Sequence, residues 1–263
     1  MSKRERIASL LRTPAGQNLA RGVLLFAVLA VWQWGISAGL RFWLSSPAKI
    51  AEKLGSWIAD GSLWGHLGAT LLVMSLGYTI GCIFGILVGL LLAFLPRTRQ
   101  ILAPYLSALN ALPKIALAPL FIIFLGIGIT SKVALVAVTV FFLLYSSTSD
   151  GIANIDLDLT RTLRLMGATR VEVIRKVMIP ASFPWIFSGM RIAVRYAFTN
   201  ALLAELISAN SGLGYLIEFY SGNFDSSGAY AAIAVLVVIS VAITEILTRI
   251  EQRFRNLPRD FPA

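Results

Sequence analysis

The chain has 263 residues, of which 57% are hydrophobic and only 14% are charged. Soluble domains carry about 25% charged residues, so a soluble globular protein is excluded. The formal charge of +10 is concentrated at the ends of apolar runs, not in a stripe interleaved with aromatic residues, which excludes nucleic-acid binding. The lone cysteine, Cys82, leaves no disulfide framework or zinc cluster within the chain, and no metal site is expected.

Several apolar runs approach the roughly 20 residues that cross a bilayer, so the sequence predicts an all-α, polytopic membrane protein. We expect about six spans, near residues 22–40, 68–95, 102–127, 132–149, 182–207 and 228–248. Lys and Arg mark the N-terminal tail (1–21), the turn at 96–100 and the C-terminal tail (251–263), and the positive-inside rule places all three in the cytoplasm. The transmembrane domain then covers 22–250, with the charged segment 150–180 also on the cytoplasmic side.

The segment 41–67, between the first two spans, falls outside the cell in this topology. Ser46-Pro47 has the pattern of an N-cap followed by proline at the first helical position. Apolar residues then recur at helical spacing: Ile50, Leu54 and Trp57. We therefore expect a short interfacial helix here. His66 has no cluster of Cys, Asp or Glu near it in the sequence, so we interpret it as a surface polar residue and not as a metal ligand.

The second predicted span carries a glycine at every fourth position: Gly77, Gly81, Gly85 and Gly89. This spacing puts the four glycines along one helix face, where another helix can approach closely. We expect packing within the same chain, with a subunit interface as the alternative.

Three prolines interrupt the third predicted span: Pro104, Pro113 and Pro119. Proline leaves backbone carbonyls without partners, and lipid does not tolerate such carbonyls. This span is therefore expected to lie against protein or a water-filled pathway.

The charged segment 150–180 is predicted to form two short amphipathic helices joined by a glycine bend. Residues 158–166 can form the first helix, and Gly167 suits the left-handed position after its end. Thr169 and Glu172 fit a capping box that starts the second helix, in which Glu172 and Lys176 form an i,i+4 pair. The expected apolar stripe of the second helix is Ala168, Val171, Ile174 and Met178. Pro180 is expected to end the element, and the compact shape favours docking on a protein over lying on lipid.

Several motifs in order resemble those of ABC importer permeases. Gly167, followed by Val177-Met178-Ile179-Pro180, resembles their cytoplasmic-loop signature. The similarity continues in LPKIALAPL at 112–120, FLGIG at 124–128, GMRIA at 189–193, AE at 204–205 and NSGLGYLI at 210–217. Together they resemble the nitrate, sulfonate and taurine branch of the binding-protein-dependent permeases, over roughly residues 45–255. The chain departs from the family where Arg161, Thr162 and Leu163 replace a common Glu-Ala pattern.

The resemblance implies a type I ABC importer (MetI-like) transmembrane domain in the bacterial inner membrane. Residues 158–180 would then couple this chain to a separate ATPase that binds ATP and Mg, and the chain itself has no phosphate-loop motif and is not expected to be an enzyme. The coupling residues it implies are Arg161, Leu163, Arg164, Met166, Gly167, Ala168, Thr169, Glu172, Ile179 and Pro180. Its expected partners are two ATPase subunits, a periplasmic binding protein and a second permease copy, with a homodimer favoured over a heterodimer.

Four ionisable residues lie inside predicted spans and are candidates for the translocation path: Lys114, Arg191, Arg195 and Glu205. Their alternatives are ion pairing with other helices or, for Arg195, extension to the membrane interface. Basic groups along a pathway favour anions, so the hypothesis is a small anionic solute such as a sulfonate, nitrate or organic acid. An ion-coupled secondary transporter is the alternative function, disfavoured because embedded acids are few and no internal repeat is evident.

Overall fold

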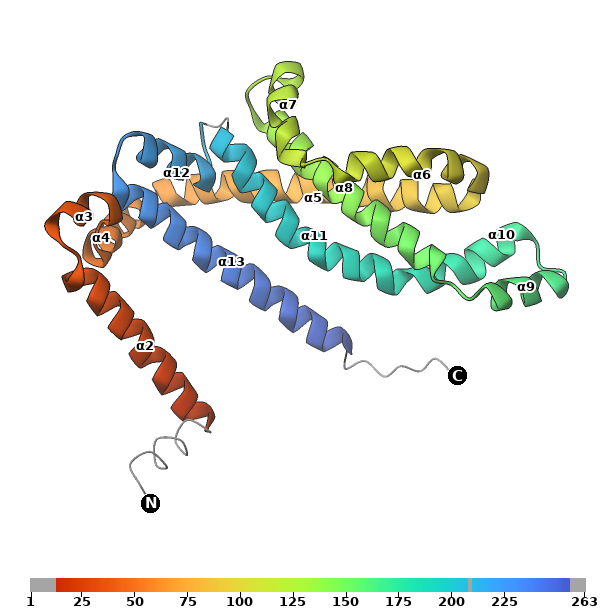
Figure 1. Ribbon diagram of the computed structural model, residues 1–263, viewed down its shortest axis with the longest axis horizontal. Coiled ribbons are helices and arrows are strands. Elements are labelled where there is room, and N and C mark those ends of the chain that lie inside the picture. The colour runs from red at the N-terminus through yellow and green to blue at the C-terminus, as the bar shows by residue number, and fades with distance from the viewer. Residues whose placement is uncertain (1–12, 208–209, 256–263) are drawn as a thin grey trace.

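The computed structural model describes residues 13–207 and 210–255, and every regular element within these ranges is helical (Figure 1). The predicted tails are covered only in part, because residues 1–12 and 256–263 lie outside the described residues. Helix α2 (Pro14–Gly35) begins inside the predicted N-terminal tail, where Thr13 Oγ1 accepts a hydrogen bond from the Gly16 amide at 3.1 Å and Pro14 occupies the first turn. It leaves most of its apolar side chains exposed and lies apart from the central helices (Figure 1).

Three long helices form the centre of the molecule: α5 (Ser62–Phe94), α8 (Ile129–Ala153) and α11 (Ile179–Ile207). Their shared core contains Val73, Cys82, Val136, Val140, Leu144, Ile186, Ala193, Ala197 and Ala201. The glycines at 77, 81, 85 and 89 of α5 lie against Val136, Val140, Leu144 and Thr148 of α8, respectively. Both sets recur every four residues, and the residue numbers increase in the same direction along the two helices, so α5 and α8 run parallel. The glycine backbone of α5 lies opposite branched or bulky side chains of α8.

The third predicted span is bent by 89° between α6 (Pro96–Ala111) and the pair η1 (Lys114–Leu117) and α7 (Ala118–Leu125). Pro113 causes the break, since a residue before proline is driven out of the helical region and Leu112 is extended, with ψ of 137°. Pro104 lies inside α6 without ending it. Five helices in the described ranges are long and apolar enough to cross a membrane, and a sixth crossing results if the bent pair is one span.

A second core joins α4 (Pro47–Ala59), α12 (Leu213–Gly222), α13 (Ser226–Arg255) and the start of α5. It contains Ile50, Trp57, Leu63, Leu213, Leu216, Ala231 and Ala232. Helix α4 does begin after Ser46 with Pro47 at its first position, but its apolar stripe packs on protein: Ile50 and Trp57 are buried. The short α3 (Ala38–Leu44) precedes it, at the same end of the molecule as α12 (Figure 1). We call this the α12 end.

The opposite end carries a helical hairpin, made of α9 (Leu157–Leu165), α10 (Arg170–Val173) and the π-helical turn η2 (Ile174–Met178), which runs into α11. Pro180 was expected to end this element, and that expectation was wrong. The π turn directly precedes α11, and the helix continues through Pro180 from Arg170 to Ile207. The second half of the hairpin and the third long helix therefore form one continuous helix, Arg170–Ile207.

Candidate functional site

The bend of the hairpin is a glycine-terminated helix end. Gly167 has φ of +89°, its amide donates to the Arg164 carbonyl at 3.0 Å, and the Ala168 amide donates to the Leu163 carbonyl at 3.0 Å. These two bonds satisfy the last carbonyls of α9 in a Schellman motif, and the positive φ is the reason for glycine at this position.

The second half of the hairpin starts with the predicted capping box. Thr169 Oγ1 accepts from the Glu172 amide at 3.3 Å, and Glu172 Oε2 accepts from the Thr169 amide at 3.0 Å. Lys176 Nζ lies 3.2 Å from Glu172 Oε1, as the i,i+4 spacing predicted. Arg161, where the family often has an acidic residue, instead pairs with Asp158 at 3.2 Å within α9.

The tip of the hairpin presents apolar side chains to the outside. Leu165 is 89% and Met166 79% exposed, while Leu163 and Ala168 are half-buried. The predicted apolar stripe of the second helix was wrong at Val171, which is exposed, whereas Val173 and Ile174 are buried. Exposed apolar groups at a tip flanked by charges of both signs can be buried by a partner protein.

A contact that the sequence did not predict fixes the hairpin to the bundle. Arg170 Nη2 donates to the Phe94 carbonyl at 3.0 Å. Phe94 is the last residue of α5, so the guanidinium caps that helix, and a cation there also interacts favourably with the helix dipole. Arg164 and Ile179, the other predicted coupling residues, are exposed and half-buried respectively. The hairpin is thus bound to the end of α5 at the start of its second half, while Leu165 and Met166 stay exposed.

A groove of about 530 Å³ lies between the bent span, α8 and α11. It is lined by Asn110, Leu112, Pro113, Lys114, Ile115, Thr139, Leu143, Ser146, Ser147, Asp150, Tyr196, Asn200 and Leu203. More than half of these side chains are polar, although they come from helices that are long and apolar enough to span a membrane. Polar side chains that line a groove between such helices can accompany a hydrophilic solute.

Of the four predicted path residues, Lys114 alone lines the groove. Its Nζ donates to the Asn110 carbonyl and, at 3.0 Å, to Asn110 Oδ1. It also lies 5.2 Å from the centre of the Phe142 ring. The bend at Pro113 places this lysine beside α8, and no sequence pattern predicted which side chains it contacts.

Arg191 and Arg195 lie elsewhere, in a crevice of about 50 Å³ that α11 forms with Thr244, Leu247 and Thr248 of α13. The helical period explains the difference, because one residue turns a helix by about 100°. The α11 residues that line the groove are Tyr196, Asn200 and Leu203, so Arg195 points to a different neighbour from Tyr196. Arg191 and Arg195 therefore lie apart from the groove that Lys114 lines, and their place in a translocation path stays a prediction.

Glu205 was also predicted in the path, but it is only 1% exposed and holds the α12 end together. Its Oε2 accepts from Thr70 Oγ1 at 2.9 Å and from the Gly214 amide at 3.0 Å. Thr70 Oγ1 in turn accepts from the Leu213 amide at 2.8 Å. Amides at the N-terminus of α12 therefore receive their acceptors from α5 and α11, an arrangement that stabilises a helix start.

His66 belongs to the same cluster and is half-buried, so its interpretation as a surface residue was wrong. Its Nδ1 accepts from the Gly212 amide at 3.1 Å, and its ring stacks on Tyr215 at 5.8 Å. Gly212 has φ of +119°, and a side chain there would collide with the Glu205 carboxylate. Among the described residues no group of three or more His, Cys, Asp or Glu could hold a metal ion.

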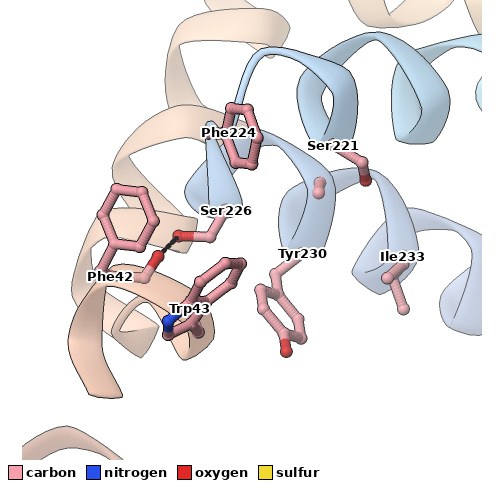
Figure 2. A pocket seen from close by; sticks show the side chains of 8 residues that line it. Phe42, Trp43, Ser221, Phe224, Ser226, Tyr230 and Ile233 are labelled. Carbon is pink, nitrogen blue, oxygen red and sulfur yellow. Dashed lines mark hydrogen bonds between the residues drawn. The ribbon is translucent and has the colours of Figure 1, made fainter. Parts of the chain in front are cut away.

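A second hollow, of about 310 Å³, lies at the α12 end between α3 and α13 (Figure 2). It is lined by Phe42, Trp43, Ser221, Phe224, Ser226, Ala229, Tyr230 and Ile233. Ser226 Oγ donates to the Phe42 carbonyl at 2.8 Å and joins its two walls (Figure 2). Its aromatic lining is typical of the level at which a membrane protein meets the lipid headgroups, so it suits an anchoring role at the bilayer surface.

Comparison with known proteins gives consistent results. Residues 81–256 match the family described as binding-protein-dependent transport system inner membrane component. The chain is 32% identical over 220 residues to the formylaminopyrimidine transport permease of Halalkalibacterium halodurans, with 82% of this chain and 88% of the relative covered. It is 32% identical over 236 residues to a putative aliphatic sulfonates transport permease of Bacillus subtilis, covering 89% and 85%.

A solved structure of the MetNI methionine ABC transporter in an inward-facing conformation matches with a TM-score of 0.60 at 21% identity, over 73% of this chain and 94% of that chain. This likeness supports the predicted MetI-like transmembrane fold. The family match extends over more than half of the chain, and two relatives exceed 30% identity over most of their length. The chain therefore belongs to the family of binding-protein-dependent transport system inner membrane components.

Proposed function

We propose that the chain forms one half of the solute pathway of an ABC importer, that the groove around Lys114 is its part of that pathway, and that the transported solute is a small anion. The observation that carries the proposal is the 530 Å³ groove between spanning helices, which has several polar side chains and one lysine among its lining residues. A lysine along a pathway lowers the barrier for anions and raises it for cations.

The groove gives weaker support for an anionic solute than a path with three basic residues would, because Lys114 lines it and Arg191 and Arg195 do not. Arg191 and Arg195 face α13, and Asp150 adds one carboxylate to the lining. Asp150 is eight residues beyond Phe142 on α8, so it lies about 12 Å further along the helix from the residue that Lys114 contacts. The relatives do not choose between solutes, since one is named for aliphatic sulfonates and another for formylaminopyrimidine.

The hairpin supports coupling to a separate ATPase through residues 158–180. Its exposed Leu165 and Met166 would be buried in a groove of that subunit, with Gly167 fixing the angle between the two helices. One hairpin per chain fits two ATPase subunits when two copies pair about a two-fold axis. A periplasmic binding protein would deliver the solute at the α12 end.

This arrangement requires the hairpin and both termini to be cytoplasmic, which can be tested with an impermeant thiol reagent on intact cells. A cysteine introduced at the exposed Ser62, at the α12 end, should react from outside, and one at Thr169 should not. Labelling of the Thr169 variant from outside would overturn the orientation.

The anion proposal is tested in the complex reconstituted with the binding protein encoded beside it. Uptake of the anions methanesulfonate and nitrate is compared with uptake of the cation choline. Lys114→Gln should reduce uptake of the transported solute at least tenfold, whereas the matched Arg195→Gln should change it little because Arg195 lies outside the groove. Normal uptake by Lys114→Gln, or choline as the transported solute, would contradict the proposal.

A further inference from the structure

Asn110 stands at the centre of the contacts around Lys114, although no sequence motif singled it out. It lies in the last turn of α6 and lines the groove. Its carbonyl and its Oδ1 both accept from Lys114 Nζ, the second at 3.0 Å. Its Nδ2 donates to Ser146 Oγ of α8 at 3.4 Å. One side chain therefore connects the end of α6, the groove lysine and α8.

The position of Asn110 explains why the lysine is held there. The last carbonyls of a helix have no partner within it, and Pro113 prevents α6 from continuing to supply one. The Lys114 ammonium takes that role, as cationic side chains near helix ends commonly do. An ammonium has three donors, so two bonds to Asn110 leave one donor and the full charge for the groove.

The Lys114 side chain has four rotatable bonds, and its ammonium is strongly hydrated. Without the Asn110 side chain, the ammonium would therefore occupy many positions. With it, the ammonium is fixed between Asn110 and the face of the Phe142 ring, 5.2 Å from the ring centre. A fixed charge attracts an anion more strongly than a mobile one, because no ordering cost is left when the anion arrives.

We propose that Asn110 is a positioning residue for the solute pathway, which holds the Lys114 ammonium at the groove wall and so sets the groove's preference for anions. This inference rests on the proposed function, since it assumes that the groove is the pathway. Asn110 acts through Lys114 and does not itself supply charge. Asn200, the other amide in the groove, differs because its Nδ2 donates to the Tyr196 carbonyl on its own helix.

The test measures the electrostatic field of the groove directly and needs no knowledge of the native solute. A reporter cysteine replaces Leu143, a groove residue next to Phe142, in the full chain purified with its partner subunits in lipid nanodiscs. Its reaction rates are measured with an anionic sulfonatoethyl methanethiosulfonate and a cationic trimethylammonioethyl methanethiosulfonate. The rate ratio, anionic over cationic, is the readout. The buried Cys82 is corrected for with the chain that lacks the reporter.

Four backgrounds are compared: no further change, Lys114→Gln, Asn110→Ala and the double variant, with Asn200→Ala as the matched control. Removing one charge within several ångströms of the reporter should lower the ratio roughly tenfold in Lys114→Gln. Asn110→Ala keeps the backbone carbonyl to which Lys114 Nζ donates, so the ratio should fall only about threefold. In the double variant Asn110→Ala should have no additional effect, because a positioning residue acts through its partner. Asn200→Ala should leave the ratio unchanged.

The outcomes separate the inference from the proposed function. An unchanged ratio in Lys114→Gln would overturn both, since the lysine would then not set the field. A lowered ratio in Lys114→Gln with the same effect of Asn110→Ala in both backgrounds would sustain the anion proposal and overturn the positioning role. An unchanged ratio in Asn110→Ala would overturn the positioning role as well.

Discussion

The hairpin and the α12 end are both held by hydrogen bonds to backbone amides and carbonyls, but the partners come from different distances along the chain. In the hairpin, Gly167, Thr169 and Glu172 bond within five residues of themselves. At the α12 end, Glu205 and His66 bond residues 9 and 146 positions away, respectively. The first region can form before the bundle assembles, whereas the second exists only after α5, α11 and α12 have met.

The largest loss of stability is expected where α5 packs on α8, because the closely packed glycines leave no room for a side chain. A side chain at Gly81 would lie 2.6 Å from the Ala137 carbonyl and from Val140 Cβ. Gly81→Leu should therefore separate α5 from α8, at a cost of about 3 kcal/mol or more. The measurement is the yield of monodisperse protein and its thermal midpoint. Gly65→Leu in the same helix has open space around it and should behave like the unchanged chain; equal behaviour of the two variants would contradict the packing.

Gly167→Val tests the locally determined region. Valine does not readily adopt a φ of +89°, so the angle between α9 and α10 should change while the bundle stays folded. We expect normal membrane insertion, at least tenfold weaker association with the ATPase and loss of transport, measured by co-purification and uptake. Gly167→Asn is the control, because asparagine tolerates this conformation and should retain most association. Wild-type transport by the valine variant would show that the hairpin is not the coupling element.

Glu205→Gln tests whether the α12 end depends on the carboxylate. Glutamine keeps the size of the side chain but replaces one carboxyl oxygen of the group that accepts from Thr70 and from the Gly214 amide with an amide NH₂. Weakening these buried bonds should cost about 2 kcal/mol, seen as a lower thermal midpoint and faster proteolysis near residue 212. Glu218→Gln, at an exposed position of α12, should change neither. An unaltered midpoint for Glu205→Gln would show that the cluster contributes no stability.

The smallest effect is expected at Asp225, which joins α13 to α4. Its carboxylate lies 3.1 Å from Lys53 Nζ, and both side chains are about a third exposed. Partial burial opposes the charged form, but hydrogen bonds from the Gly228 amide and Lys53 together hold the pKa of Asp225 below its usual range. Asp225→Asn should cost about 0.5 kcal/mol at neutral pH.

The sign of the pH dependence follows from the lowered pKa of Asp225. Its stabilisation is present above the ordinary carboxyl pKa and is lost as the pH falls through the lower, folded-state value. The difference in thermal midpoint between the variant and the unchanged chain should therefore shrink in acid. A difference that grows as the pH falls would contradict this account.

Much of the fold follows from patterns that act over a few residues. Apolar length predicted the spans, although Pro14 and Thr13 start the first helix earlier than the basic residues suggested. The glycine bend and the capping box were predictable because both depend on the conformational freedom of glycine and on a spacing of three residues. The interruption at Pro113 was predictable for the same kind of reason, whereas its angle of 89° was not.

The membrane spans, the helix breaks and the hairpin segment could be predicted from the sequence, because apolar length, charge and backbone preference are properties of neighbouring residues. The neighbours of each charged side chain, by contrast, became known only from the packing of the helices. Asn110 accepts a hydrogen bond from Lys114 and donates one to Ser146 of α8. Arg195 lies against α13, and Glu205 accepts a hydrogen bond from the Gly214 amide at the start of α12. These contacts depend on how the helices bend and rotate against one another. Because successive residues of a helix are rotated by about 100°, adjacent residues face different neighbouring helices.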